Sequence, residues 1–224
     1  MIKKIFNLGV PSAMQMFFEV AIFTAAIWLS GLLGKNPQAA NQIALNLASM
    51  TFMVAMGLSV AAMIRVGNQK GLKQYGELRR IAFSIFLFGF IFAVGFALLF
   101  LIFHNQLPKL YLDHNDITNA LDNAEVLEIA AKLLLVAAVF QISDSIQVMV
   151  LGALRGLQDV KIPMLLLFVA YWIIGFPVSW FLGKDEVYGS IGIWIGLLSG
   201  LTVAAILLYI RFNYLTKKLI LSNN

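Results

Sequence analysis

FQISDSIQVMVLGALRGLQDVKIP, at residues 140–163, is a largely apolar stretch that holds a carboxylate among serines and glutamines. The carboxylate is Asp144, and a second acid, Glu19, interrupts the first apolar run of the chain. An ionisable side chain inside a membrane helix is costly unless it faces a protein interior, a partner or water. We therefore expect a membrane protein that brings Glu19 and Asp144 to one cavity.

The composition is that of a polytopic membrane protein. Of the 224 residues, 61% are hydrophobic and only 12% are charged, and the mean hydropathy is +0.87. A membrane-spanning helix needs about 20 mostly apolar residues. Six stretches meet this requirement, at residues 8–33, 39–64, 81–103, 127–151, 163–182 and 190–210. The sequence thus predicts an all-α fold in which residues 1–224 form a single domain of six transmembrane helices.

The connections between these spans differ in charge on the two sides of the membrane. Most of the 16 lysines and arginines fall on the side of the N-terminus, whereas the other side carries most of the acids. Loops that stay in the cytoplasm are enriched in Lys and Arg. We therefore expect a multi-pass membrane protein with both termini in the cytoplasm. An amphipathic pattern at residues 117–128 predicts a short helix along the opposite membrane surface.

Three of the predicted spans carry polar side chains on one helical face. These stripes consist of Ser12, Gln15 and Glu19; of Gln42, Asn46 and Ser49; and of Gln141, Ser143, Asp144, Ser145 and Gln147. Such stripes line a hydrated cavity in a carrier, but they also form hydrogen bonds between helices. For the amides and hydroxyls both interpretations stay open. For the two carboxylates we favour function, because no Lys or Arg is expected at the same depth.

Two carboxylates in apolar surroundings can bind a proton or a small monovalent cation. Burial favours the neutral form of a carboxyl group, and a second carboxylate nearby favours it further. Carboxylate, amide and hydroxyl oxygens also suit a hard cation, so Glu19 and Asp144 form a candidate Na⁺ site. Either ion could couple its gradient to a change of shape, and a cationic substrate would compete for the same charge. The sequence does not choose between H⁺ and Na⁺, and it predicts no cofactor.

Other classes of protein find no support in the sequence. There is no phosphate-binding glycine loop and no nucleophile motif, and the two histidines, His104 and His114, lie outside the predicted spans. The absence of cysteine excludes disulfides and thiolate metal sites. The basic segment at residues 65–80 suits anionic lipid headgroups, so the net charge of +5 requires no nucleic acid as a partner. We expect neither an enzyme nor a nucleic-acid-binding protein.

Glycine and proline mark two places of close packing or bending. Gly196 and Gly200 form a small-xxx-small pair in the last predicted span, which predicts close helix packing. Gly175 and Pro177 are expected to interrupt the fifth span.

Five segments, in order, resemble the C-terminal six-helix lobe of the MATE (multidrug and toxic compound extrusion) transporters, in particular their NorM-like members. They are GVPSAMQMFFEV at residues 9–20, QAANQIALNL at 38–47, GLSVAAMIRVGNQKG at 57–71, the stretch at 140–163, and YWIIGFP at 171–177. The resemblance implies a cation-driven antiporter in the lipid bilayer that exports small organic cations. It also implies two six-helix lobes related by an axis along the membrane normal.

The resemblance implies roles for particular residues as well. In NorM-like members, acids in the first and fourth helices of this lobe contribute to cation binding, which places Glu19 and Asp144 at the coupling site. A tyrosine one turn before that aspartate is also implicated, and here the position is Phe140, which has no hydroxyl. The candidates for lining the cavity are Gln15, Gln42, Asn46, Phe140, Gln141, Gln147 and Tyr171.

The N-terminal lobe of that family has no counterpart in this sequence. We expect it as a partner, supplied by the same longer chain, by a separate chain or by a second copy in a homodimer. Two other functions stay open. A flippase for lipid-linked glycans, from the same superfamily, would need a cavity rich in Arg and Lys. A non-transporting membrane accessory subunit would tolerate neutral replacement of both acids.

Overall fold

The computed structural model describes residues 2–112 and 120–222. The elements are α1 (Ile2–Leu32), α2 (Lys35–Gly71), α3 (Tyr75–Phe103), the 3₁₀ turn η1 (Leu107–Tyr111), α4 (Ala120–Gly156), α5 (Lys161–Phe168), the π-helical segment η2 (Val169–Gly175), α6 (Phe176–Leu182) and α7 (Gly189–Leu221). No strand occurs within the two described ranges. The all-α fold expected from the sequence is confirmed.

Six helices are long and apolar enough to cross a membrane, as the sequence predicted. One of them consists of α5, η2 and α6 together, from Lys161 to Leu182. α2 and α4 each have 37 residues, which at 1.5 Å per residue gives a length of about 55 Å. The hydrocarbon core of a bilayer is only about 30 Å thick. Both helices therefore extend past it, which explains why the spans predicted from hydropathy are shorter.

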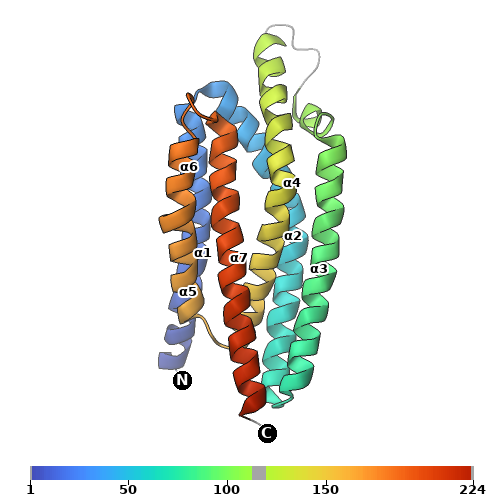
Figure 1. Cartoon of the computed structure of the whole chain (residues 1–224), viewed down its shortest axis with the longest axis vertical. Helices are drawn as coiled ribbons and strands as arrows, with labels where there is room; N and C mark the ends of the chain where they lie inside the picture. Colours follow the sequence, from blue (N-terminus) through green and yellow to red (C-terminus); the bar gives the residue numbers. More distant parts are fainter. Residues whose placement is uncertain (1, 113–119, 223–224) are drawn as a thin grey trace.

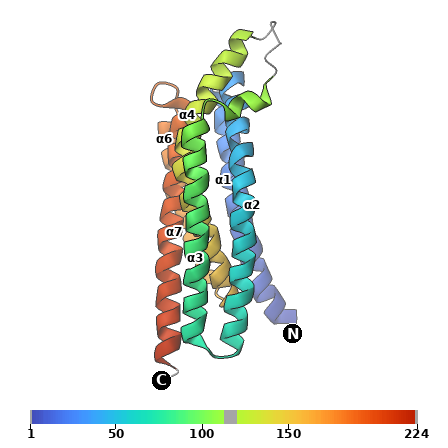
Figure 2. The ribbon, with the colours of Figure 1, turned by 90° about the vertical axis from the view of Figure 1, so that its right-hand side faces the viewer.

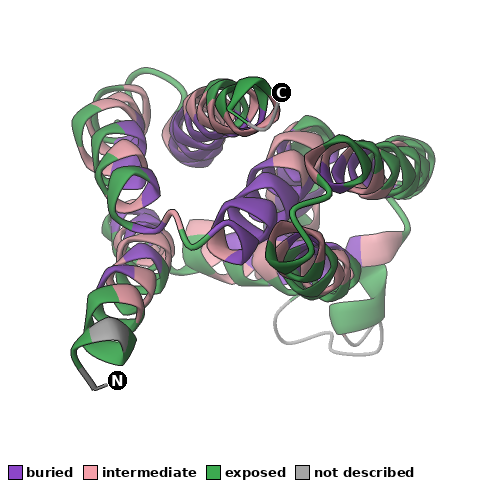
Figure 3. Cartoon of the chain, turned by 90° about the horizontal axis from the view of Figure 1, so that it is seen from below, coloured by how far each residue is buried: buried purple, intermediate pink, exposed green. Residues whose placement is uncertain are grey.

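The helices run up and down along one long axis (Figure 1). α1 begins and α7 ends at the same end of the bundle, called the terminal end below. α4 is the central helix, since α2, α3 and α7 all pack against it (Figure 1). Seen from below, buried residues concentrate in the middle of the bundle and exposed ones on its outside (Figure 3). α3 lies beside α2 (Figure 2), and α1 packs mainly on α5. The bundle thus has a central group of helices with α1, α5 and α6 beside it.

α2 and α4 approach closely because α4 carries glycine at two positions one turn apart. A Cβ at Gly152 would lie 2.3 Å from the carbonyl oxygen of Ser59, and one at Gly156 would lie 2.5 Å from that of Met63. Side chains larger than hydrogen do not fit at such distances, and small residues are what allow membrane helices to pack this closely. The Ser59 hydroxyl uses the proximity, because it donates to the Val148 carbonyl at 2.7 Å.

α6 and α7 meet in a similar way. A Cβ at Gly196 would lie 2.3 Å from the Ser179 nitrogen, and one at Gly200 would lie 3.1 Å from the Gly175 Cα. The close packing predicted for Gly196 and Gly200 is therefore confirmed. The Ser179 hydroxyl donates to the Ile193 carbonyl at 3.0 Å and fixes the two helices further.

The regular α-helix of the fifth span is interrupted where Gly175 and Pro177 were expected to interrupt it, but the backbone stays helical. α5 ends at Phe168, and the π-helical segment η2 ends at Gly175 within a span that continues to Leu182. Pro177 lies in the first turn of α6, directly after η2. A π turn shifts the hydrogen-bond register, so a proline nitrogen without a hydrogen can follow it without breaking the helix.

The region before the fourth span also differs from expectation. From Ala120 onward, the predicted surface helix of residues 117–128 is the beginning of α4. Residues 117–119 lie outside the described residues, as does His114. No glycine or proline occurs between Ala120 and Leu151, so the helical pattern of the surface segment continues directly into the span.

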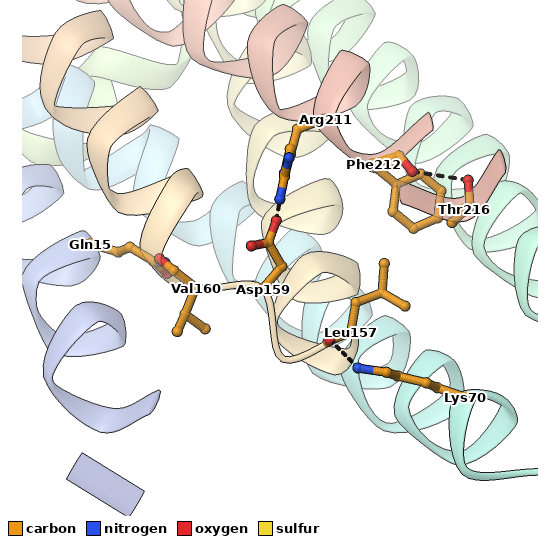
Figure 4. Close-up of polar contacts among 8 residues, drawn as sticks. All are labelled: Gln15, Lys70, Leu157, Asp159, Val160, Arg211, Phe212 and Thr216. Carbon is orange, nitrogen blue, oxygen red and sulfur yellow. Dashed lines mark hydrogen bonds and ion pairs between the residues drawn. The ribbon is translucent and has the colours of Figure 1, made fainter. Parts of the chain in front are cut away.

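The linker between α4 and α5 is held from several sides at the terminal end (Figure 4). The Nε of Arg211, in α7, donates to the Asp159 carboxylate at 2.8 Å, and both side chains are mostly buried. Two more helices reach the linker through bonds to backbone carbonyls: Lys70 of α2 donates to Leu157, and Gln15 of α1 donates to Val160. The linker therefore joins α1, α2 and α7 at one place.

Candidate functional site

A cavity of about 400 Å³ lies between α1, α2 and α4. Its polar and charged lining residues are Glu19, Gln42, Asn46, Ser49, Asp144 and Arg155. Apolar and aromatic side chains supply most of the remaining surface. The structure thus brings the two predicted acids together on one cavity, with Glu19 coming from α1 and Asp144 from α4.

The two carboxyl groups have different surroundings. Asp144 is only 5% exposed, and its Oδ1 has no hydrogen-bond partner among the described residues. Glu19 is half-buried. The ion pairs within residues 2–112 and 120–222 include neither acid. A negative charge here is therefore costly unless a cation or water enters the cavity, because an uncompensated charge in a protein interior is strongly disfavoured.

The α2 wall of the cavity is rich in amides. Gln42 and Asn46 lie one turn apart on its exposed side, where the sequence predicted them. In the part of the chain that the structure describes, neither side chain forms a hydrogen bond. Ser49, a turn further along, donates its hydroxyl to the Leu45 carbonyl at 2.7 Å. The wall therefore offers amide oxygens and N–H groups to whatever occupies the cavity.

The aromatic surface of the cavity lies beside Asp144. Phe140 lines the cavity as predicted, with its ring centroid 6.0 Å from that of Phe23 and 5.2 Å from that of Trp194. The indole N–H of Trp194 donates to the Asn41 side-chain oxygen at 2.9 Å, which fixes the indole from behind. A fixed aromatic surface close to carboxylates suits organic cations, which aromatic faces attract.

Arg155 is a site residue that the sequence analysis missed. The expectation that no Lys or Arg lies near the acids holds less well for Glu19 than for Asp144, because α4 continues to Gly156 and places Arg155 on the same cavity as Glu19. Asp144 is eleven residues away from Arg155 on the same helix, about 16 Å along its axis. The Nε of Arg155 donates to the Gln15 side-chain oxygen at 3.0 Å. The signal that could have revealed it is the unbroken helical pattern of LGALRG, at residues 151–156, after the fourth span.

Four of the predicted candidates do not line the cavity. Gln15 is buried, accepts from Arg155 and donates its Nε2 to the Val160 carbonyl at 2.7 Å. Gln141, Gln147 and Tyr171 are also buried, and their side-chain polar atoms have no hydrogen-bond partner among the described residues. Tyr171 belongs to η2. Of the polar residues that the helical wheel grouped on one side of α4, Asp144 lines this cavity, whereas Ser143 forms a hydrogen bond of 2.9 Å with Thr202 of α7.

The donor set favours a proton or a monovalent cation over a transition metal. No group of three or more His, Asp or Glu side chains that could hold a metal ion occurs within the described ranges. Two carboxylates with amide and hydroxyl oxygens nearby are instead the ligands of a hard, weakly charged cation. The residues present thus fit Na⁺ or H⁺ at Glu19 and Asp144.

These features define a class, the polytopic helical membrane proteins with an acidic cavity inside the bundle. The MatE family model matches residues 11–181. The multidrug resistance protein NorM of Aliivibrio fischeri is 39% identical over 220 residues, which cover 96% of this chain and 46% of the relative. The multidrug resistance protein MdtK of Proteus mirabilis is 36% identical over 221 residues, which cover 97% and 46%. The chain belongs to the MatE family, whose members are transporters and not enzymes.

Solved structures show the same fold. The eukaryotic MATE transporter AtDTX14 matches with a TM-score of 0.81 at 22% identity, over 96% of this chain and 47% of that one. The Vibrio cholerae MATE transporter VcmN in its bent form matches with a TM-score of 0.82 at 16% identity, over 96% and 47%. This chain therefore spans about half the length of the relatives and structures that it matches.

Proposed function

We propose that this chain is one six-helix lobe of a cation-coupled multidrug efflux antiporter, which exports small organic cations in exchange for Na⁺ or H⁺. The observation that carries the proposal is the cavity shared by Glu19 and Asp144 between α1, α2 and α4. The relatives named as multidrug resistance proteins support the substrate class.

The coupling follows from competition for one negative site. Glu19 and Asp144 lie on the same cavity, so a bound proton or Na⁺ and a bound organic cation neutralise the same charges. Each ligand therefore weakens binding of the other. Exchange results if the cavity opens to one side of the membrane with the ion bound and to the other side with the substrate bound, since a ligand shifts a conformational equilibrium by its differential affinity.

Arg155 links the cavity to the backbone of the linker before α5 through two hydrogen bonds. It lines the cavity with Glu19 and donates to Gln15, which in turn donates to the Val160 carbonyl in the linker before α5. When Glu19 is charged, its carboxylate competes with Gln15 for the guanidinium. Release of a cation from Glu19 would thus change how α1 and α4 are joined at the terminal end.

A second lobe is needed to cover the polar α2 wall. Gln42, Asn46 and Ser49 are exposed in this chain, and polar groups facing hydrocarbon without partners are costly. The partner could come from the same longer chain, from a separate chain or from a second copy. A water-filled passage between the lobes would satisfy these side chains and give the substrate a route.

We also infer that the terminal end faces the cytoplasm of a bacterial cell, with the protein in the inner membrane. Basic residues cluster near this end: Arg65, Arg79, Arg80, Arg211, Lys217 and Lys218. Enrichment of Lys and Arg in the cytoplasmic segments supports this orientation.

A lipid-linked glycan flippase is the second candidate, and Arg155 is the observation that favours it. A basic side chain in the cavity could bind an anionic headgroup. The cavity also holds two acids, which would repel that headgroup, so the antiporter agrees better with the lining as a whole.

The test is export of ethidium and norfloxacin by the protein in the assembly that it forms in membranes. We expect Glu19→Gln and Asp144→Asn each to abolish most export, because each removes a coupling charge, while Glu186→Gln, an exposed acid outside the cavity, leaves export unchanged. A Na⁺ gradient applied at clamped pH distinguishes the two ions.

Unchanged export in both cavity variants would rule out coupling through these acids. Absence of export from the unmodified assembly, with normal insertion, would favour the accessory subunit instead. Movement of a labelled lipid-linked glycan that depends on Arg155 but not on the acids would favour the flippase.

A further inference from the structure

A second, shallower cavity of about 470 Å³ lies between α2 and α3 near the terminal end. It is lined by Arg65 of α2 and by Glu77, Arg80 and Ser84 of α3, with alanine and isoleucine side chains between them. We call it the α2–α3 groove. α2 and α3 lie side by side and are joined by a short turn at this end (Figure 2). The groove belongs to neither the acidic cavity nor the linker contacts.

The two arginines lie at the same depth. Arg65 comes six residues before α2 ends at Gly71, and Arg80 comes five residues after α3 begins at Tyr75. At 1.5 Å per residue, both lie about 7–9 Å along their helices from the turn. Arg65 and Arg80 therefore line one groove from two helices, near the end of the bundle where we expect these helices to leave the hydrocarbon.

The charges of the two arginines are largely uncompensated. Arg65 forms no ion pair or hydrogen bond with any residue in the ranges 2–112 and 120–222. Arg80 meets Glu77 at 3.7 Å, but both side chains are more than half exposed, and exposed pairs contribute little. The neighbouring Arg79 differs, because it donates to the Asn213 side-chain oxygen at 2.9 Å and lies over the Phe83 ring. Arg79 therefore serves helix packing, and the other two stay available for a ligand.

We propose that the α2–α3 groove binds the phosphate-bearing headgroup of an anionic membrane glycerophospholipid, with Arg65 and Arg80 as the anion ligands. Guanidinium groups bind phosphate oxygens in pairs of parallel hydrogen bonds, and basic pockets between transmembrane helices bind such headgroups. The Ser84 hydroxyl already donates to the Arg80 carbonyl at 3.0 Å, so the arginines are the donors for the phosphate. The proposal does not depend on the antiporter function.

A lipid suits the groove better than a free phosphate. Large apolar side chains are exposed further along both helices, away from the turn: Val60 and Ile64 on α2, and Leu87, Phe88 and Ile91 on α3. Acyl chains would cover these side chains while the headgroup occupies the basic end. A free phosphate would satisfy the arginines but leave the apolar surface without a partner.

The test measures retained lipid by native mass spectrometry, on the protein purified from membranes in the assembly that it forms there and offered phosphatidylglycerol or phosphatidylcholine. We expect preferential retention of phosphatidylglycerol. Arg65→Gln and Arg80→Gln should each lower it about five-fold, as expected for loss of one basic residue at an anionic headgroup. Glu77→Gln should raise it, because it removes the carboxylate that competes with phosphate for Arg80.

Lys217→Gln is the matched control, since it removes one exposed positive charge near the same end but outside the groove. Retention within about two-fold of the unmodified protein is expected for this variant. Equal losses in Lys217→Gln and in both arginine variants would mean diffuse charge attraction and overturn the site. Equally effective competition by inorganic phosphate would assign the groove to a soluble anion and overturn the lipid. No gain in Glu77→Gln would remove the assignment of Arg80.

Discussion

At the scale of single residues, Asp144 and Glu19 share a cavity but not an environment. Asp144 is 5% exposed and its Oδ1 has no partner among the described residues, whereas Glu19 is half-buried and shares its cavity with Arg155. Glu19 therefore has a positive group near it, and Asp144 depends more on what enters the cavity. A buried acid without a partner lowers stability, so the role proposed for Asp144 gives predictions of opposite sign for export and for stability.

Replacing Asp144 with Asn should stabilise the protein while it abolishes export. The variant keeps the shape of the side chain but can never carry the charge that is costly in this position. In sodium-free detergent solution we expect the free energy of unfolding to rise by about 1–2 kcal/mol, or roughly 3–6 °C in Tm. The gain should grow as the pH rises, because only the charged form of the wild-type carboxyl group is penalised. Thermal unfolding of the variant and the unmodified protein over a pH series measures this difference in Tm.

Asp122→Asn is the control for this prediction. Asp122 lies in the first turn of α4 with its carboxylate 3.3 Å from the Lys35 ammonium, and both side chains are well exposed. Its loss should change Tm little at any pH. If Asp144→Asn lowered Tm at all pH values, Asp144 would be making a stabilising interaction in the folded state, contrary to its surroundings here.

At the scale of helices, the contact between α2 and α4 depends on glycine. A Cβ added at Gly152 would meet the Ser59 carbonyl oxygen at 2.3 Å and its carbonyl carbon at 2.9 Å. Both are backbone atoms, so no change of rotamer relieves the clash. Gly152→Ala should therefore force the helices apart and lower the free energy of unfolding by about 1–3 kcal/mol.

Gly95→Ala tests whether this effect belongs to the helix contact. Gly95 lies in α3, and an added Cβ there would meet nothing within 4 Å. Alanine is the better helix former, so this variant should be equally stable or more stable, by up to about 1 kcal/mol. Thermal unfolding of the two purified variants decides the matter, since equal losses of stability would show that any alanine in the bundle is disruptive.

The sequence predicted the number of membrane-length helices, but not where each helix ends or which side chains its neighbours bury. Hydropathy predicted all six membrane-length helices of the described residues, because a run of about 20 mostly apolar residues is typical of a membrane-spanning helix. It could not predict that α4 continues to Gly156, because a helix outside the hydrocarbon leaves no apolar signal. Arg155 was therefore left outside the fourth predicted span, which ends at residue 151. Gly175 and Pro177 marked the irregularity in the fifth span, but they did not predict that it takes the form of the π-helical segment η2. Gln141 and Gln147 were wrongly assigned to the cavity lining. A helical wheel gives the direction of each side chain but not which neighbouring helix packs against it.

At the scale of the whole molecule, the acidic cavity lies between two groups of helices. Glu19 comes from α1, which packs mainly on α5, while Asp144 comes from α4, the centre of the other group. The linker after α4 joins the groups at the terminal end through the Asp159–Arg211 pair and the bond from Gln15. α7 also packs closely on η2 and α6, so the two groups are joined along α7 as well as at the linker. A change in the width of the cavity would therefore move α1 relative to α4 while the contact of α6 with α7 is kept.

The natural absence of cysteine makes the state of the α2 wall directly measurable. Asn46 lies on the cavity side of α2 and Phe88 on the exposed surface of α3, which we expect to face lipid. In the assembled protein, a water-soluble maleimide applied from both sides should modify Asn46→Cys at least about ten-fold faster than Phe88→Cys, because the reaction needs a hydrated thiolate. Ethidium should slow the reaction of Asn46→Cys, since it would occupy the same cavity.

Asp185→Cys, in an exposed loop, sets the rate for full access to water. A reaction of Asn46→Cys as slow as that of Phe88→Cys would mean that the partner covers the α2 wall with dry packing, and the cavity could then not serve as a passage for cations.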